Sequence, residues 1–267
     1  MFELKGKVIV LTGATGALGS ALALSLAKAE AKLVLLGRNQ ALMDALVDQL
    51  SAFTTAVAYA VDVMNRDDLM RVRKQIVGTF QRIDVLINAV GGNLPGAVIP
   101  DDQSIFNLSV ADFDQVVDLN LKGTLLPSIV FGEVMSQQKK GSIINYSSMA
   151  VDRVITRVVG YSASKAAMEN FTRWMAVEMA LKFGDGIRVN AIAPGFFIGK
   201  QNRDLLLNKE GSLSERGEKI IRNTPMKRFG EAEELNGPIH FLCSDSASFV
   251  TGIVLPVDGG FSAYSGV

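Results

Sequence analysis

Short apolar runs recur along the whole chain, and longer segments with helical spacing separate them. The runs lack the strict polar alternation of a strand with one wet face, which is typical of strands covered on both faces. Parallel strands joined by right-handed helical crossovers produce this pattern. We therefore predict an α/β fold with a doubly wound parallel sheet of about seven strands and helices on both faces. The predicted strands are Val8–Thr12, Leu33–Leu36, Val57–Val61, Val85–Asn88, Ser142–Tyr146, Val189–Ile192 and Ile253–Val257.

The length of 267 residues, 48% of them hydrophobic, can bury the core of one large α/β domain. Neither a repeat nor a low-complexity linker divides it, so we expect one domain over residues 1–267. In such sheets ligands lie beyond the carboxyl ends of the strands. The segments Gly91–Leu108 and Pro194–Ser214 follow strands without clear periodicity, and loops of that length are usually functional. We expect substrate loops at about 91–108 and 194–223.

Composition excludes several classes of partner. Lys+Arg and Asp+Glu are both 27, so no bulk positive charge attracts nucleic acid or an anionic membrane. The single cysteine, Cys243, and the single histidine, His240, exclude an internal disulfide framework and leave too few ligands for a structural zinc site. The N-terminus lacks the apolar stretch of a signal peptide, and no apolar run reaches about 18 residues. We expect a soluble, cytoplasmic protein that takes a small-molecule substrate and needs no metal.

A glycine-rich segment joins the first predicted strand to the first predicted helix. Glycines at this point allow a sharp turn and let a pyrophosphate approach the helix N-terminus. The apolar stripe Leu18, Leu22 and Leu26 favours a helix packed on the sheet, and thus a dinucleotide site rather than a plain tight turn. The candidate cofactor-binding residues here are Gly13, Thr15, Gly16, Leu18 and Gly19.

The ends of the next strands predict the rest of the cofactor site. Arg38 follows the second strand, where an arginine suits a 2′-phosphate and an acid would bind a ribose hydroxyl; alternatively it is a solvated turn charge. NADP(H) is therefore favoured, with NAD(H) possible. Asp62, with Val63, could bind adenine, or Asp62 could cap the helix predicted over Arg66–Phe80. Asn88 and Gly91 end the fourth strand, although Asn88 could instead tie neighbouring strands together.

Tyr161 and Lys165 lie four residues apart, which on a helix is one turn and one face. A phenol with a pKa near 10 is a poor base at pH 7, and a nearby ammonium favours the phenolate. Such a pair is often only a surface contact. Ser148, at the end of a predicted strand thirteen residues upstream of Tyr161, favours chemistry because its hydroxyl could hold a carbonyl oxygen.

Together these residues resemble the short-chain dehydrogenase/reductase family over essentially the whole chain. The resemblance implies a single-domain Rossmann fold and a homotetramer partly formed by the C-terminal segment. It also implies that Tyr161 is the general acid/base, Lys165 lowers its pKa and holds the nicotinamide ribose, and Ser148 polarises the carbonyl. Asn120 would anchor a water that relays protons, and Pro194 and Gly195 would border the nicotinamide. The sequence departs from the family pattern at three positions, which are Ala17, Ala89 and Gly199.

The predicted substrate segments are polar and basic, which favours a carboxylate and several hydroxyls as ligands. The candidate substrate residues are Asn93, Arg153, Arg157, Lys200, Gln201, Asn202 and Arg203. The loops also resemble the D-mannonate oxidoreductase (fructuronate reductase) subgroup, which acts on sugar acids. The alternatives are a 3-oxoacyl thioester reductase and a nucleotide-sensing protein without turnover.

Four further residues have structural explanations. Trp174, Met175 and Phe241 are expected in the core or in subunit contacts, and His240 is expected to be structural. The segment Phe229–Leu242 is predicted to be helical, with its glutamates in the first turn.

Overall fold

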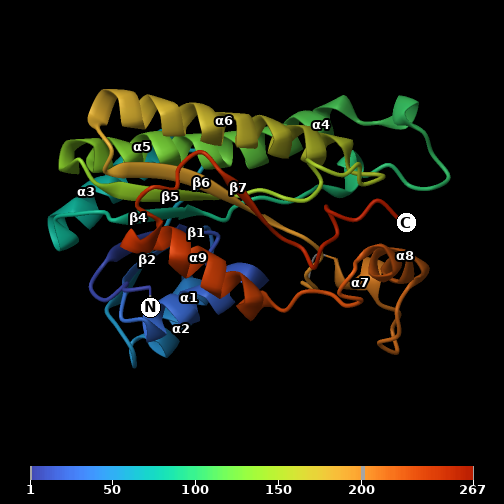
Figure 1. Cartoon of the computed structure of the whole chain (residues 1–267), viewed down its shortest axis with the longest axis horizontal. Helices are drawn as coiled ribbons and strands as arrows, with labels where there is room; N and C mark the ends of the chain where they lie inside the picture. Colours follow the sequence, from blue (N-terminus) through green and yellow to red (C-terminus); the bar gives the residue numbers. More distant parts are fainter. Residues whose placement is uncertain (1, 200–201, 267) are drawn as a thin grey trace.

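A single sheet of seven parallel strands forms the centre of the computed structural model, which describes residues 2–199 and 202–266 (Figure 1). The strand order is β3-β2-β1-β4-β5-β6-β7, which confirms the predicted doubly wound Rossmann fold. The predicted strands are all present and differ from the observed ones by no more than two residues at either end. Their bounds are β1 (Val8–Thr12), β2 (Lys32–Gly37), β3 (Ala56–Ala60), β4 (Val85–Asn88), β5 (Gly141–Tyr146), β6 (Ile187–Pro194) and β7 (Val254–Val257).

Helices cover both faces of the sheet (Figure 1). The helices are α1 (Ala17–Lys28), α2 (Gln40–Leu50), α3 (Arg66–Phe80), α4 (Val110–Val117), α5 (Gly123–Gln138), α6 (Val159–Phe183), α7 (Arg203–Leu206), α8 (Glu215–Asn223) and α9 (Asn236–Cys243). Short 3₁₀ turns are η1 (Pro95–Ala97), η2 (Ile105–Asn107), η4 (Ala232–Leu235) and η5 (Asp245–Ala247), and η3 (Asp118–Lys122) is a π-helical turn.

Side chains that alternate along each strand point to opposite faces of the sheet and belong to two separate apolar clusters. One cluster joins β1 and β2 to α1, α2 and α9, through residues such as Leu22, Met43 and Ile239. The other lies on the opposite face against α3, α5 and α6, with Phe131 and Met179 among its members. Because both faces are buried, the strands carry almost no exposed side chains and their positions are fixed. The loops at the carboxyl ends are thereby held on a rigid frame.

Local capping explains where some of the helices begin, and it corrects two predictions. Asn65 caps α3 by accepting hydrogen bonds from the backbone N–H groups of Asp67 and Asp68, at 3.0 and 3.2 Å. The alternative that Asp62 caps this helix is therefore wrong. The predicted helix over Phe229–Leu242 begins later, because η4 forms a 3₁₀ turn closed by a capping box of Glu231 and Glu234 before α9 starts.

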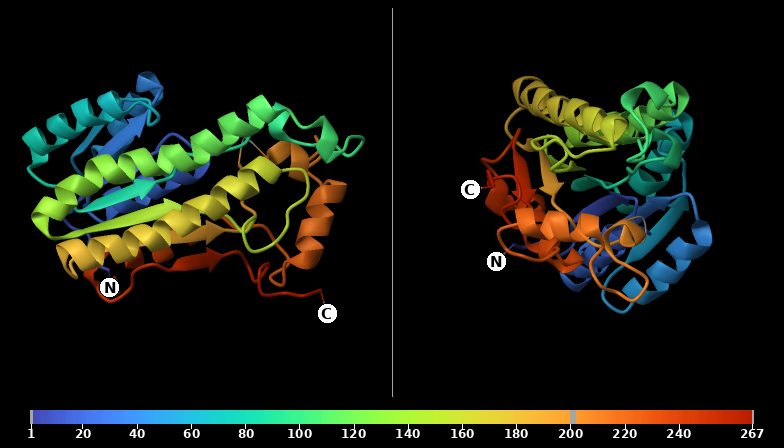
Figure 2. Two further views of the ribbon diagram at one scale, coloured as in Figure 1. Left: turned by 90° about the horizontal axis from the view of Figure 1, so that it is seen from above. Right: turned by 90° about the vertical axis from the view of Figure 1, so that its right-hand side faces the viewer.

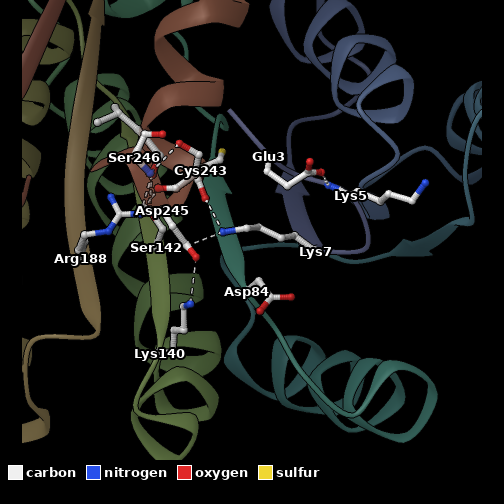
Figure 3. Close-up of polar contacts among 12 residues, drawn as sticks. Glu3, Lys5, Lys7, Asp84, Lys140, Ser142, Arg188, Cys243, Asp245 and Ser246 are labelled. Atoms are coloured by element: carbon white, nitrogen blue, oxygen red, sulfur yellow. Dashed lines mark hydrogen bonds and ion pairs between the residues drawn. The ribbon is translucent and has the colours of Figure 1, made fainter. Parts of the chain in front are cut away.

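The amino ends of the strands are held together by an ion network (Figure 3). Asp245 bridges Lys7 at 2.8 Å and Lys140 at 3.2 Å, which come from the segments that precede β1 and β5. Arg188 of β6 is buried and donates hydrogen bonds to the carbonyl oxygens of Leu242 and Ser244 at 3.0 and 3.1 Å. The amino ends of the strands are therefore closed by structural contacts, and the loops predicted to bind substrate extend from the carboxyl ends (Figure 2).

Two kinds of feature are not found in the part of the chain that the structure describes. None of its helices combines the length and apolar character needed to cross a membrane. No three side chains among histidine, cysteine, aspartate and glutamate lie close enough there to hold a metal ion.

Candidate active site

The loop between β1 and α1 is built so that only glycine fits at two positions. Gly13 has a φ of +70°, and a Cβ there would lie 2.7 Å from the carbonyl oxygen of Ala89. A Cβ on Gly19 would lie 2.3 Å from the carbonyl oxygen of Gly13. Thr15 and Gly16 are exposed at the tip, directly before the helix N-terminus. This cradle fits a pyrophosphate, since backbone N–H groups and the helix dipole both favour an anion there.

The neighbouring strand ends carry the residues predicted to bind the adenosine half of the cofactor. Arg38 follows β2 and is exposed. Asp62 is also exposed, and its Oδ1 accepts a hydrogen bond from the backbone N–H of Met64 at 2.9 Å. Val63 is buried. Leu18 is half-buried against the first apolar cluster, so it supports the loop from below.

Asn88 performs the structural role that the sequence left open. Its side chain is buried, and its Nδ2 donates to Asn145 Oδ1 on β5 and to Ser128 Oγ on α5, both at 2.9 Å. It therefore ties β4 to its neighbours. Gly91, three residues later, leaves room for two predicted catalytic side chains, since a Cβ there would lie 2.7 Å from Asn120 Oδ1 and 3.0 Å from Lys165 Nζ.

Asn120 lies on the π-helical turn η3 and is fully buried. Its Nδ2 donates to the carbonyl oxygens of Gly92 at 2.7 Å and Val116 at 2.8 Å, and its Oδ1 accepts from the backbone N–H of Gly92 at 3.1 Å. Single π turns inside helices frequently mark functional sites. In the structure the side chain thus fixes the turn after β4 beside Lys165.

Lys165 is the cation of the site. It is buried, and its Nζ donates a hydrogen bond to the carbonyl oxygen of Tyr146 at 2.7 Å while lying 5.6 Å from the centre of the Tyr161 ring. Burial lowers the pKa of Lys165 to about 8, because the charged form loses its hydration. Both side chains project from α6, so the predicted one-turn spacing brings them together.

Burial is the largest influence on the phenol of Tyr161. Burial raises the pKa of Tyr161, and the hydroxyl of Ser148 opposes this shift but does not outweigh it. In the protein alone the loss of hydration dominates this balance, and the lowering of the Tyr161 pKa by Lys165 stays a prediction. The contact of Tyr161 with Ser148 joins the hydroxyl that could hold a carbonyl to the group that could exchange its proton.

A buried polar layer beneath these residues was not predicted from the sequence. Glu169, one turn after Lys165 on α6, accepts a hydrogen bond from Ser147 Oγ at 2.6 Å and pairs with Arg173 at 3.1 Å. Thr172 accepts a hydrogen bond from Asn145 Nδ2 at 2.9 Å. These bonds fasten the end of β5 to α6, which fixes Ser148 relative to Tyr161. The sequence signal for this layer was the position of Glu169, four residues after Lys165 and therefore on the same face of the helix.

The segment after β6 closes the site on its other side. Gly195 donates its N–H to the carbonyl oxygen of Val257 at 2.9 Å, and Pro194 accepts a hydrogen bond from the N–H of Met149 at 3.2 Å. A Cβ on Gly199 would lie 3.7 Å from the Cβ of Ala17. The chain from Pro194 to Gly199 therefore runs from the end of β6 to the glycine loop.

The predicted substrate residues fall into two groups. Arg153 donates from Nε to the carbonyl oxygen of Ser262 at 2.8 Å, and Asn202 donates from Nδ2 to the carbonyl oxygen of Phe197 at 2.8 Å, so both hold loops together. The Nδ2 of Asn93 is buried with no hydrogen-bond partner. Arg203 is exposed at the start of α7, and Arg157 is half-buried before α6. Lys200 and Gln201 lie outside the described residues.

Sequence reasoning treated the second substrate segment as a loop, but the structure contains two helices there. Ser214 caps α8 by accepting the N–H of Gly217 at 3.1 Å, and α7 packs against α8. This helix carries Arg216, a half-buried arginine that contacts Thr156 in the segment before α6 and was not identified from the sequence.

Comparison with known proteins agrees with this geometry. Residues 13–262 match the family model described as enoyl-(acyl carrier protein) reductase. The chain belongs to the short-chain dehydrogenase/reductase family. It is 46% identical to an uncharacterized oxidoreductase, UxuB, of Bacillus subtilis, over 99% of this chain and 98% of that protein. It is also 34% identical to a 3-oxoacyl-[acyl-carrier-protein] reductase of Synechocystis, over 97% of this chain and 98% of that protein.

Among solved structures, one from Haemophilus influenzae has a TM-score of 0.92 and 42% identity, covering 99% of this chain and 98% of the other. That protein is assigned provisionally as a D-mannonate oxidoreductase and was solved with bound NAD. The chain is accordingly an oxidoreductase of this family, with a site that fits a nicotinamide cofactor.

Proposed function

We propose that the protein transfers a hydride between NADP(H) and the carbonyl or hydroxyl carbon of a sugar acid of the D-mannonate or D-fructuronate type. The observation that carries the proposal is the polar and basic rim that Arg157 and Arg216 form where the segment leading into α6 meets α8, together with the buried Lys165 beside the half-buried Tyr161. A sugar acid offers a carboxylate and several hydroxyls to such a rim. The likeness to the structure assigned provisionally as a D-mannonate oxidoreductase supports the same substrate class.

The residues divide the chemistry between them. The raised pKa of Tyr161 keeps its phenol protonated at neutral pH, which is the form that donates a proton to a carbonyl oxygen. Ser148 would hold that oxygen through its hydroxyl. Lys165, with a pKa of about 8, is mostly charged at neutral pH and lies close enough to stabilise a phenolate. The nicotinamide, when bound, supplies or accepts the hydride, and the glycine loop with Arg38, Asp62 and Gly195 would hold the cofactor.

Two alternatives are weaker. A 3-oxoacyl thioester reductase would use the same four side chains, and the Synechocystis relative is named for that activity. It would, however, be served by an apolar groove rather than by arginines. A nucleotide-sensing protein would not need Lys165 buried beside Tyr161, since burying an ammonium costs free energy that binding alone does not repay.

A substrate screen tests the function. Hexonates with oxidised cofactors, and keto-hexuronates with reduced ones, should turn over with a 10- to 100-fold higher kcat/KM than the matching neutral sugars. That ratio corresponds to about 1.5–3 kcal/mol for one charge-assisted hydrogen bond. Equal efficiency with acids and neutral sugars, or best activity on a long-chain 3-oxoacyl thioester, would refute the proposal.

Arg38 tests the preference for NADP(H). Replacing Arg38 with alanine should weaken NADPH binding by about 1.5–3 kcal/mol and leave NADH binding nearly unchanged, because only NADPH carries the 2′-phosphate. Cofactor fluorescence measures both dissociation constants. Arg71→Ala, which removes an exposed arginine of α3, is the matched control. Equal weakening of both cofactors, or tighter binding of NADH by the unaltered protein, would contradict the NADP(H) preference.

A further inference from the structure

Two arginines meet where the segments that follow β4, β5 and β6 come together. Arg157 donates from Nε to the carbonyl oxygen of Ile99 at 3.1 Å, and its Nη1 lies 3.5 Å from a carboxylate oxygen of Asp101. Arg216, in the first turn of α8, donates to the hydroxyl and the carbonyl oxygen of Thr156, both at 3.5 Å. Neighbouring residues, Thr156 and Arg157, thus connect α8 to the loop after β4.

The electrostatic balance at this point is positive. Burial lowers the pKa of Arg216, and the positive charge of Arg157 lowers it further, whereas Asp101 opposes the shift less strongly. The side chain of Asp101 is 86% exposed, so its contact with Arg157 is well screened by water. Two guanidinium groups therefore share one exposed carboxylate, and a second anion between them would relieve their mutual repulsion.

The backbone holds Arg157 in a costly conformation. Its φ is +79°, in the left-handed region that residues with a Cβ rarely adopt. The N–H of Ile99 donates to the carbonyl oxygen of Arg157 at 3.0 Å, and Nε of Arg157 donates to the carbonyl oxygen of Ile99. Two hydrogen bonds therefore join these residues. Backbone strain of this kind persists where the surrounding structure fixes it, and it gathers at ligand sites.

Chain connectivity keeps Arg157 near Tyr161. Arg157 precedes Tyr161 by four residues, and four residues span at most about 14 Å of chain. Arg216 lies beside Arg157, because it contacts the preceding residue Thr156, and its helix α8 is at the carboxyl end of the sheet (Figures 1 and 2). A ligand held against Tyr161 could therefore reach both guanidinium groups with an acid at its far end.

We propose that Arg157 and Arg216 form the carboxylate-binding pair for the substrate, with Arg216 as the specificity-determining residue carried by α8. This inference rests on the proposed function, since it names the residues that recognise the acid group of a sugar acid. Arg157 is held rigidly by its loop. Arg216 contacts its protein partners only at the outer limit of hydrogen-bond distance, so it is able to turn toward the anion.

Kinetics of single variants test the pair. Arg216→Ala should raise KM for the sugar acid at least tenfold, lower kcat much less, and leave kcat/KM for the matching neutral sugar within about twofold. Arg216→Lys should restore part of the preference for the acid, because it keeps the charge but loses the two-bond geometry. Arg222→Ala, which removes an exposed arginine in the last turn of the same helix, is the control and should behave like the wild type.

The possible outcomes are distinct. If Arg216→Ala loses kcat/KM equally with acid and neutral substrates, Arg216 only holds the loops together. If its kinetics are unchanged with both substrates, the two arginines do not bind the carboxylate. In either case the wild type still turns over sugar acids, so the proposed function stands. If the wild type turns over no sugar acid with either cofactor, the proposed function fails and the pair falls with it. Cofactor fluorescence and the melting temperature establish that each variant is folded. If Arg216→Ala does not fold, Arg157→Ala provides a second test, since it should also raise KM for the sugar acid but not for the neutral sugar.

Discussion

Tyr161 and Lys165 show how burial sets the chemistry of single side chains. The phenol of Tyr161 is a weaker acid than a phenol in water, whereas the ammonium of Lys165 is a stronger acid than a free lysine, because each group moves toward its neutral form. The sequence indicated the spacing of the pair, but the direction of the Tyr161 shift depends on the depth of the site. The two shifts lead to separate predictions.

Removal of the Tyr161 hydroxyl should abolish proton transfer without disturbing the cofactor cradle. We expect Tyr161→Phe to lower kcat by more than about 10²-fold, the lower end of general acid/base contributions, while the dissociation constant of NADPH changes little. Steady-state kinetics and cofactor fluorescence measure the two quantities separately. A variant that keeps more than half of the wild-type rate with every accepted substrate would show that another group exchanges the proton.

Lys165 should make the stability of the protein depend on pH. Its pKa is about 8 in the folded protein and near 10.5 in the unfolded chain, so between these values the unfolded chain binds more protons. The free energy of unfolding contributed by this group therefore rises with pH across that window, by about 1.4 kcal/mol per unit. Chemical denaturation of wild type and Lys165→Met at pH 7 to 9.5 should show the wild type gaining about 2 kcal/mol relative to the variant. A constant difference between the two would contradict the lowered pKa.

At the scale of elements, the join between β1 and α1 combines a turn and a helix start in a few residues. Gly19 belongs to the helix, but its missing side chain is what allows the loop backbone at Gly13 to pass over it. Gly78 also lies inside a helix, α3, yet a Cβ there would have nothing within 4 Å. The two glycines therefore differ in their reasons for being glycine.

Alanine at these two positions should have opposite effects. Gly19→Ala should displace the Gly13 carbonyl, weaken NADPH binding at least tenfold and lower the melting temperature, because the contact is with backbone rather than with a flexible side chain. Gly78→Ala should stabilise the protein by about 0.5–1 kcal/mol and leave cofactor binding unchanged, since alanine has the higher helix propensity. Calorimetry and fluorescence titration measure both effects. Similar effects from the two substitutions would show that helix propensity, and not the close approach, governs Gly19.

The same scale shows what the sequence can and cannot predict. The strands and the helix over Arg66–Phe80 were predictable, because burial on one or both faces imposes a regular apolar pattern. The helix α8 was not, since only Gly217 and Ile220 of its nine residues are buried and the rest carry no apolar stripe. The π turn at Asn120 is set by tertiary hydrogen bonds to Gly92, which no local pattern encodes. Arg216 was missed for the same reason as the helix that carries it.

At the scale of the whole molecule, the amino and carboxyl ends of the strands have different roles. The amino ends of the strands are fastened by Asp245 with Lys7 and Lys140 (Figure 3), and the carboxyl ends carry the loops in which we propose the cofactor and substrate sites (Figure 1). The outer face of α6 lies at neither end of the strands. It exposes Trp174, Val177 and Leu181, the last with 81% of its surface accessible. Trp174 is therefore not a core residue, and that part of its prediction is wrong.

These three side chains fall at i, i+3 and i+7, so they form one apolar stripe on α6, and Ile129 is exposed on the adjacent helix α5. Such a stripe suits a two-fold interface, in which each copy covers the same residues of the other. We expect a homo-oligomer, a tetramer by family resemblance, in sedimentation experiments. Leu181→Glu should split it across this face, because losing one buried leucine already costs about 2 kcal/mol and an unpaired carboxylate costs more. Leu42→Glu, at an exposed leucine of α2, is the control and should leave the assembly intact. A wild-type monomer, or an assembly that tolerates Leu181→Glu, would show that the stripe on α6 pairs with no second copy.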